Sequence, residues 1–348
     1  MFAVAVTEPG KVEIVEVPEP TPGPYEALIK TEIAALCNST DRKLIEAHFP
    51  GVDRYPLLLG HETVGIVVAV GEKVRNFHVG DRVVGGLLLN STDPHYASGW
   101  GGFSEYTLAG DHLAMVEDGV ARPEYGWVEV HEIMRSVPRT ISLEDAVLLC
   151  TWREVYGAFD DFSLRPGDDI VVFGAGPVGL SFVKFARLLG LNEIYVVEFV
   201  EAKRQKALEM GATAAYEPGS AELAELVERR GKPFDAVIDA VGKESIINAA
   251  LPMIKLGGSI CVYGVIDTPS IQLDKIRGPY NFNLLVHQWP TRARERAAQE
   301  PLVAWIEAGK LSYREFVSAE YPIQEIAQAF EQSKTGQPIK TLLRYSRS

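Results

Sequence analysis

The amino-acid sequence predicts a mixed α/β chain of two domains, in which a β-rich, barrel-like part is joined to a doubly wound parallel sheet. The length of 348 residues exceeds what one hydrophobic core usually organises. Residues 1 to about 110 contain short strand-like runs between Pro- and Gly-rich breaks. Beyond Ser142, apolar strands alternate with helix-like stretches, which is typical of a doubly wound sheet.

The composition excludes several classes of partner. A formal net charge of -13 argues against nucleic acid and against anionic membrane surfaces. No apolar run reaches the length of a membrane span, and the first residues lack the basic region and cleavage site of a signal peptide. The three cysteines, Cys37, Cys150 and Cys261, are too few for a disulfide framework and indicate a reducing compartment. We therefore expect a cytoplasmic protein.

The first domain is predicted to be a small, irregular β-barrel. Its strands are expected at residues 2–6, 11–17, 26–35, 62–70 and 81–86. The segment 87–100 has little regular pattern and is expected to form a loop or lobe.

The pattern changes near Ser142, where a helix is expected to begin with two carboxylates, which are favourable at the N-terminal end of the helix dipole. The second domain lies beyond this point. Its predicted strands lie at 169–173, 193–197, 234–238 and 258–263, and its helices at 177–189, 201–209 and 244–254. Two more helices are expected at 301–309 and 323–334. A closing strand at 339–345 is predicted to return to the first domain.

A glycine-rich turn follows the strand 169–173 directly and opens a helix. In Gly174-Ala-Gly176-Pro-Val-Gly179, the first glycine permits the tight turn, the second lets the backbone approach a pyrophosphate, and the third lets helix and strand pack closely. Glu198 ends the next strand, where a carboxylate would hold the adenosine ribose hydroxyls and repel a 2′-phosphate. NAD is therefore favoured over NADP, although the adjacent basic pair Lys203 and Arg204 could grip a phosphate.

A possible metal site begins with His61, which stands at the start of a β-branched run. Together with Cys37 and Cys150 it would give Zn²⁺ two thiolates and an imidazole and leave one position open, as a catalytic zinc requires. Spacing alone does not establish this site. Either cysteine could be a small buried apolar residue, and the histidine could be buried and bonded to backbone.

One motif begins with Gly60-His61-Glu62 and continues with Gly65 after two residues, Gly71 after five more and Val74 after another two. This motif resembles the zinc signature of the medium-chain alcohol dehydrogenases. The resemblance implies a GroES-like catalytic domain over 1–149 and 291–348 and a Rossmann dinucleotide-binding domain over 150–290. It also implies that Cys37, His61 and Cys150 are zinc ligands and that Glu62 is a neighbouring or exchangeable ligand. The cofactor contacts that motif and resemblance imply are Gly174, Gly176, Pro177, Val178, Gly179, Glu198, Lys203, Arg204, Val241 and Val265.

The chain departs from the family pattern after its first cysteine. Cys37-Asn-Ser39-Thr40-Asp41 is one residue longer than the usual Cys-x-Ser/Thr-Asp, so either Ser39 or Thr40 could relay the hydroxyl proton. The histidine that passes the proton onward in some relatives is missing. No cysteine lies between Cys37 and Cys150, so we expect one catalytic zinc and no structural zinc.

The resemblance implies NAD-dependent oxidation of an alcohol, with zinc as Lewis acid and nicotinamide as hydride acceptor. The missing structural lobe resembles the polyol and sugar dehydrogenase branch, so a polyol is the first expectation and a secondary alcohol the next. Residues 87–100 and Trp289 are expected to select the substrate. The family habit is a homodimer or homotetramer. The alternative is a zinc-free quinone reductase-like or a non-catalytic dinucleotide-binding protein of the same fold.

Overall fold

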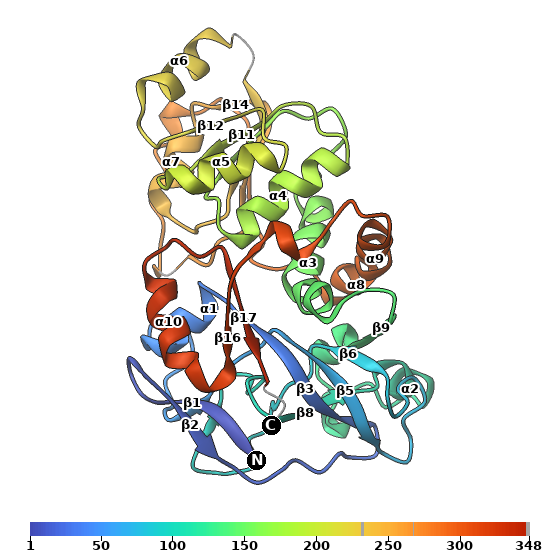
Figure 1. Cartoon of the computed structure of the whole chain (residues 1–348). Helices are drawn as coiled ribbons and strands as arrows, with labels where there is room; N and C mark the ends of the chain where they lie inside the picture. The colour runs from blue at the N-terminus through green and yellow to red at the C-terminus, as the bar shows by residue number, and fades with distance from the viewer. Residues whose placement is uncertain (231–232, 267, 346–348) are drawn as a thin grey trace. The chain divides into compact units, whose positions relative to one another are not determined.

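A computed structural model describes residues 1–230, 233–266 and 268–345. The chain divides into two compact units, which Figure 1 shows in ribbon form. Unit 1 consists of Met1–Thr151 and the described residues from Arg292 onward. Unit 2 consists of the described residues of Trp152–Thr291. The first unit is therefore built from two separate stretches of sequence, and the second from one.

Unit 1 contains two β-sheets. Its strands are β1 (Phe2–Glu8), β2 (Lys11–Glu16), β3 (Glu26–Leu36), β4 (Leu57–Leu58), β5 (Thr63–Val70), β6 (Arg82–Val84), β7 (Ala97–Ser98), β8 (Tyr106–Gly110), β9 (Arg135–Val137), β16 (Val317–Pro322) and β17 (Lys340–Arg344). The smaller sheet has the order β2-β1-β4-β7. The larger has the order β16-β17-β3-β5-β6-β9, with β8 pairing also with β3.

The helices of unit 1 are mostly short. They are α1 (Thr40–Ile45), α2 (His112–Glu117), the first turns of α3 (Leu143–Asp161), α8 (Arg292–Ala297), α9 (Gln299–Glu307) and α10 (Ile326–Lys334), with 3₁₀ turns at Pro123–Tyr125, Glu129–Ile133, Tyr313–Glu315 and Ile323–Glu325. Ile326, Ala329 and Phe330 repeat at helical spacing in α10 and are buried in one apolar cluster with strand residues such as Leu36 and Leu343. This cluster packs around the end of β3.

The register of the larger sheet brings three strand ends together. Strand β3 is antiparallel to both β5 and β17, so its carboxyl end lies beside their amino ends. Ala34 pairs with Thr63 of β5, and Leu36 pairs with Thr341 of β17. The residues that immediately follow β3 and precede β5 and β17 therefore meet at one edge of the sheet.

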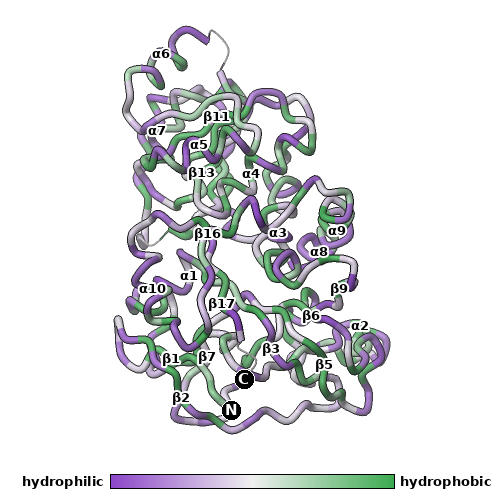
Figure 2. The backbone as a smooth tube through the Cα atoms, viewed as in Figure 1, coloured by the Kyte–Doolittle hydropathy of each residue, from purple (hydrophilic) through white to green (hydrophobic). Residues whose placement is uncertain are grey.

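Unit 2 is a six-stranded sheet with the order β12-β11-β10-β13-β14-β15, in which all neighbouring strands are parallel. Its strands are β10 (Ile170–Phe173), β11 (Ile194–Val197), β12 (Ala214–Tyr216), β13 (Phe234–Asp239), β14 (Ile254–Val262) and β15 (Asn283–Val286), and its helices are the rest of α3, α4 (Pro177–Leu188), α5 (Glu201–Glu209), α6 (Ala221–Arg229) and α7 (Glu244–Ala250), with a 3₁₀ turn at Lys275–Arg277. The hydrophobic colouring of β11 and β13 in Figure 2 follows from burial on both faces.

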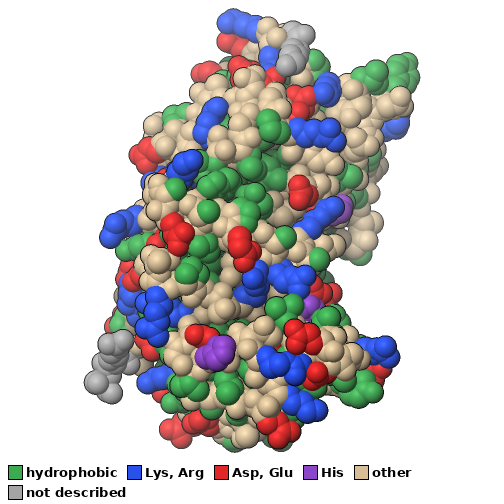
Figure 3. Space-filling view, turned by 90° about the vertical axis from the view of Figure 1, so that its right-hand side faces the viewer, with side chains coloured by type: hydrophobic (Ala, Val, Ile, Leu, Met, Phe, Trp, Pro, Cys, Tyr) green, Lys and Arg blue, Asp and Glu red, His purple; other side chains and the backbone are tan. Residues whose placement is uncertain are grey.

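Most expected elements are present, with three differences in unit 2. The helix expected at 244–254 ends at Ala250, because the chain turns into β14 at Ile254. Two short strands, β12 and β15, and the helix α6 were not expected from the sequence. The described helices include none that is long and apolar enough to cross a membrane. Acidic, basic and hydrophobic side chains are interspersed on the face shown in Figure 3.

Candidate active site

His61 is held in place by the close approach of two backbone segments. Gly60, just before it, has φ of 105°, and a Cβ there would lie only 2.2 Å from Cδ1 of Phe103. Only glycine fits such a position without displacing its neighbour. The backbone of Phe103 also donates to the carbonyl of Leu59 at 2.9 Å. The chain therefore enters β5 along one fixed path, and His61 starts from a rigid base.

Cys37, His61 and Glu62 form a cluster of metal-binding side chains in unit 1. One ligand atom from each lies within 4.8 Å of the others. Cys37 follows the end of β3 and His61 and Glu62 precede β5, so the antiparallel register described above places them together. Sulfur and imidazole nitrogen are the donors that zinc prefers over magnesium or calcium. The donor set and its spacing fit a zinc ion.

Asp41 contacts both Cys37 and His61. Its Oδ2 accepts a hydrogen bond from the backbone N–H of Cys37 at 2.8 Å, and its Oδ1 lies 3.2 Å from Nδ1 of His61. The carboxyl group is fully buried. Burial opposes the charge of His61, but Asp41 and Cys37 together outweigh that effect and raise the pKa of the imidazole well above its ordinary value. Because Nδ1 faces Asp41, Nε2 is the nitrogen left to bind a metal.

Glu62 is paired with a buried lysine at the start of the last strand. Nζ of Lys340 lies 2.6 Å from Oε1 of Glu62, and Oγ1 of Thr151 donates to Oε2 of Glu62 at 3.1 Å. Side-chain exposure is 2% for Lys340 and 5% for Glu62, so both charges are removed from water. Burial opposes the charge of Lys340, but Glu62 and then Cys37 outweigh it and raise the pKa of the lysine. The pair leaves Glu62 with little freedom to move.

Cys150 lies close to this cluster but is not one of its members. It is buried in the helix α3, and its Sγ donates to the carbonyl of Thr63 at 3.8 Å. Thr63 directly follows Glu62, so the sulfur approaches the site from the side of β5. Among the described residues, the close group of ligand atoms contains Cys37, His61 and Glu62 without Cys150. The structure thus offers Glu62 and Cys150 as alternative third ligands.

The two hydroxyl candidates differ in their surroundings. Ser39 is the N-cap of α1 but makes no capping bond with its side chain, and it is exposed. Thr40 is the first residue of α1 and is partly buried. Both follow the cluster residue Cys37 within one turn. Thr40 is therefore the more confined of the two.

The glycine-rich turn in unit 2 connects β10 directly to α4. A Cβ on Gly179 would lie 1.9 Å from the carbonyl oxygen of Gly174, so helix α4 packs directly on the turn at the end of β10. Pro177 opens α4 and Val178 follows it, both partly buried. A Cβ on Gly176 would meet no atom within 4 Å, which leaves open space where a pyrophosphate would approach. The N-terminus of α4 faces this space.

Glu198 lies at the end of β11 and bonds to the same turn. Its Oε2 accepts from the backbone N–H of Ala175 at 2.7 Å, and its Oε1 accepts from Val200 at 2.9 Å. Burial lowers the pKa of Lys203, although Glu198 opposes the shift. Arg204 donates to the carbonyls of Glu198 and Phe199 at 2.7 Å each. The basic pair therefore belongs to the structure around Glu198 rather than projecting freely into solvent.

The two valines expected near the cofactor follow neighbouring strand ends. Val241 comes just after β13 and is 43% exposed, and its backbone N–H donates to Oδ1 of the buried Asp239 at 2.9 Å. Val265 follows β14, and its carbonyl oxygen would lie 2.6 Å from a Cβ on Gly242. Adjacent parallel strands end at the same edge of the sheet, so these valines lie on the edge where the glycine-rich turn is found.

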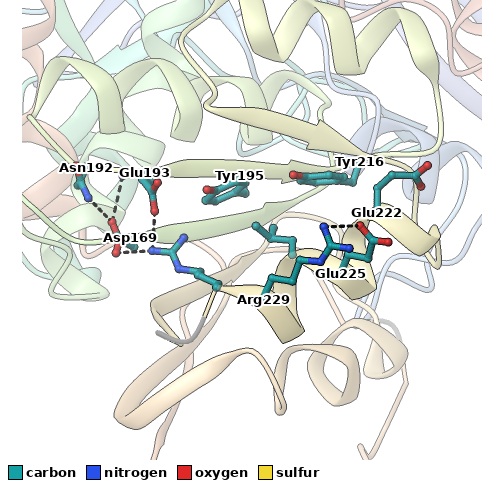
Figure 4. Close-up of a pocket in the computed structure, with 10 residues that line it drawn as sticks. Asp169, Asn192, Glu193, Tyr195, Tyr216, Glu222, Glu225 and Arg229 are labelled. Carbon is teal, nitrogen blue, oxygen red and sulfur yellow. Dashed lines mark hydrogen bonds and ion pairs between the residues drawn. The ribbon is translucent and has the colours of Figure 1, made fainter.

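A separate hollow of about 750 Å³ lies in unit 2 between α6 and the strands β11 and β12 (Figure 4). Its lining residues are Asp169, Asn192, Glu193, Tyr195, Tyr216, Glu222, Glu225, Leu226, Arg229 and Arg230. None of the residues expected to bind zinc or dinucleotide is among them. Arg230 fills part of it, because it pairs with Asp169 and lies over the ring of Tyr195.

Comparison with known proteins identifies the family. Residues 23–118 match the alcohol dehydrogenase GroES-like domain, and residues 177–287 match the zinc-binding dehydrogenase domain. The NADP-dependent isopropanol dehydrogenase of Thermoanaerobacter brockii is 32% identical over 75% of this chain and 74% of its own. The sorbitol dehydrogenase of Halalkalibacterium halodurans is 28% identical over 96% of both chains. The structure of the alcohol dehydrogenase TADH from Thermus sp. ATN1 has a TM-score of 0.80, with 24% identity and 99% of both chains covered.

The chain belongs to the zinc-dependent medium-chain dehydrogenase family. It is an oxidoreductase of the alcohol dehydrogenase type, and membership implies zinc and a nicotinamide cofactor. The predicted GroES-like and Rossmann folds are confirmed.

Sequence reasoning missed two residues that hold the cluster together. Asp41 stands in the quoted motif, but nothing in the sequence indicates that its carboxylate contacts His61. Lys340 carries a weak signal, since a lysine at the head of a buried run, Lys340-Thr-Leu-Leu, requires a buried partner. The partner could not be named from the sequence.

Proposed function

We propose that this protein is a zinc- and NAD-dependent dehydrogenase that oxidises an alcohol, whether a polyol, a sugar or a secondary alcohol, to the carbonyl compound. The observation that carries the proposal is the group formed by Cys37, His61 and Glu62, whose ligand atoms lie within 4.8 Å of one another. The other unit of the same chain carries a glycine-rich turn bonded to an acidic strand end at Glu198. Metal-binding and dinucleotide-binding features together support hydride transfer from an alcohol.

One zinc would be held by Cys37, His61 and Cys150, with Glu62 as a neighbouring or exchangeable ligand. When bound, zinc supplies a Lewis acid that lowers the pKa of an alcohol hydroxyl. Asp41 fixes the direction of the His61 ring, since it lies 3.2 Å from Nδ1. Lys340 holds Glu62 by a buried ion pair and so fixes where its carboxylate lies beside Cys37 and His61. We propose no structural zinc.

The hydroxyl proton would pass to a side chain beside the cluster. Thr40 is the better candidate, because it is partly buried at the start of α1, whereas Ser39 is exposed. A confined hydroxyl can be held within hydrogen-bond reach of the substrate oxygen, as proton transfer requires. Ser39 remains the alternative.

NAD is the proposed cofactor, with NADP second. Glu198 lies at the end of β11 and accepts hydrogen bonds from Ala175 and Val200, so its carboxylate is fixed beside the glycine-rich turn. A fixed carboxylate at this position would accept the ribose hydroxyls and repel a 2′-phosphate. Arg204 is occupied by the carbonyls of Glu198 and Phe199, which reduces its capacity to grip a phosphate. The relative from Thermoanaerobacter brockii is named NADP-dependent, and titration with both cofactors distinguishes the two possibilities.

The substrate is a small alcohol or polyol, in line with relatives named sorbitol dehydrogenase and isopropanol dehydrogenase. We propose a cytoplasmic homodimer or homotetramer without nucleic-acid or membrane partners. The acidic net charge of -13 and the small, odd number of cysteines support this setting.

The deciding experiment is a substrate panel read as reduction of NAD or NADP, combined with metal analysis of the purified protein. We expect NAD-linked oxidation of at least one alcohol class and about one zinc per chain. Absence of turnover with all alcohols in a protein that holds zinc, or full activity in a protein without zinc, would contradict the proposal.

A further inference from the structure

Trp100 lies against the imidazole ring of His61. Their ring centroids are 5.6 Å apart at an interplanar angle of 58°. The indole also meets Phe49 edge-on, with centroids 5.6 Å apart and an angle of 86°. Both separations fall within the range in which aromatic rings are in contact. Trp100 thus stands beside one residue of the metal cluster, and Phe49, from a separate loop, stands beside Trp100.

The backbone holds Trp100 in an unfavourable conformation. Its φ is 68°, in the left-handed region that side chains with a Cβ rarely adopt. Such conformations persist where the surrounding structure imposes them. Here the carbonyl of Trp100 accepts from Leu88 at 2.9 Å, and the N–H of Gly102 donates to the carbonyl of Gly60 at 2.7 Å. Because Gly60 precedes His61, one set of hydrogen bonds fixes both the indole and the imidazole.

Apolar side chains pack on the indole. Trp100 packs against two hydrophobic clusters, one that contains Leu57 and Leu59 and another that contains Leu87. Phe49 packs against the first of these clusters. Both aromatic rings are only partly buried, so each keeps surface that another molecule can cover. A hydroxyl pressed against this surface would lose its bonds to water without gaining a partner, whereas an apolar group would be stabilised by burial.

We propose that Trp100 and Phe49 form an aromatic wall of the substrate site, and that the preferred alcohol carries an aryl or alkyl substituent rather than the hydroxylated chain of a polyol. This inference rests on the proposed function, because the cluster around His61 sets where the carbinol group must lie. It revises the order of substrates expected from the sequence: a secondary alcohol with an apolar group comes before a polyol. Trp100 determines specificity through contact with the substituent.

The test compares three substrates on the zinc-loaded enzyme: 1-phenylethanol, 2-propanol and xylitol. Wild type should prefer 1-phenylethanol in kcat/KM. Trp100→Ala should lower that kcat/KM by about 10- to 100-fold, since a lost apolar contact of this size discriminates substrates by such factors. The kcat/KM for 2-propanol should change less than about threefold, because a methyl group is too short to cover the indole. Phe49→Ala should show the same pattern with a smaller loss.

The matched control is Trp127→Ala, which removes a tryptophan of the same unit whose Nε1 donates to His112 at 3.1 Å. It should leave the ratio of the three substrates unchanged. Should Trp100→Ala fail to fold, Trp100→Leu and Phe49→Ala carry the test. A wild type that prefers xylitol would overturn the inference and leave the proposed function standing. An equal loss for all three substrates in Trp100→Ala would also overturn it, because the residue would then act only through His61. Absence of turnover with every alcohol would instead contradict the proposed function.

Discussion

The dinucleotide site and the metal cluster are assembled in opposite ways. The turn from Gly174 to Gly179 is a single local segment, and its acidic partner Glu198 ends the next strand along the chain. The metal cluster draws on Cys37 after β3 and on His61 and Glu62 before β5, and it is locked by Lys340 from β17. A local site needs only its own strand, turn and helix. A dispersed site requires the register of a whole sheet to be correct.

This difference predicts how the two sites respond to substitution. A change in the dinucleotide turn should affect cofactor affinity and leave the metal in place. A change in the metal cluster should affect several properties together, because the cluster residues contact several elements, with Asp41 in α1, Thr151 in α3 and Lys340 in β17. The following variants test this contrast, from the largest expected effect to the smallest.

Removal of a cluster ligand should have the largest effect. Cys37→Ala should lose zinc and detectable turnover while NAD binding is retained, since the dinucleotide site lies in the other unit. Metal analysis and NADH fluorescence measure the two properties. Cys261→Ala is the matched control, because Cys261 is a free, buried cysteine of β14.

Metal analysis also decides whether Cys150 or Glu62 is the third zinc ligand. We expect Cys150→Ala to lose zinc and Glu62→Gln to retain it. The opposite result would make Cys37, His61 and Glu62 the complete protein ligand set, as their spacing within 4.8 Å would allow.

Thr40→Val should lower kcat by about 10²–10⁴ with zinc retained, which is the usual cost of losing a positioned proton acceptor. Ser39→Ala should be much milder, because Ser39 is exposed. Steady-state and pre-steady-state rates of both variants measure the difference. If the order were reversed, Ser39 would be the relay, and two mild variants would leave the proton to water.

Lys340→Met should destabilise unit 1 by about 3–5 kcal/mol, because Glu62 would become a buried charge without its 2.6 Å partner. Urea unfolding monitored by circular dichroism measures the loss. Lys340→Met/Glu62→Gln should recover most of it, since the uncompensated charge is then absent. Unchanged stability in the single variant would mean that water reaches Glu62.

Glu198→Ala should weaken NAD binding by about 10- to 100-fold, in line with the loss of hydrogen bonds to a charged group. NADP binding should improve, because the carboxylate that would repel its phosphate is gone. Titration with both cofactors checks the shift, and zinc content should not change. A wild-type enzyme that favours NADP would assign this subsite to Lys203 and Arg204 instead.

The sequence predicted those parts of the molecule that local patterns determine. The buried strand Ile170–Phe173 and the turn after it were located correctly because apolar runs and glycine spacing act over a few residues. Strands β12 and β15 were missed because neither is a continuously buried apolar run: β12 is partly buried throughout, and both ends of β15 are exposed.

The contacts that hold the metal cluster together could not be predicted from the sequence, for a different reason. The pair between Glu62 and Lys340 joins residues 278 positions apart, and it follows from the register of β17 on β3. The contact of Asp41 with His61 likewise depends on the start of α1 folding back beside β5. No local pattern encodes either contact.

The position of β17 in the larger sheet also sets an order of events during synthesis. Unit 2 is one continuous segment and can fold once its own residues have left the ribosome. Strand β3 of unit 1, in contrast, can pair with β17 only after β17 has been translated, near the end of synthesis. Until then the last residues of β3, from Ile33 to Leu36, lack their partners on β17, and Glu62 lacks its cation. We therefore expect nascent chains arrested before residue 340 to carry a folded unit 2 beside a first unit that neither retains zinc nor resists proteolysis.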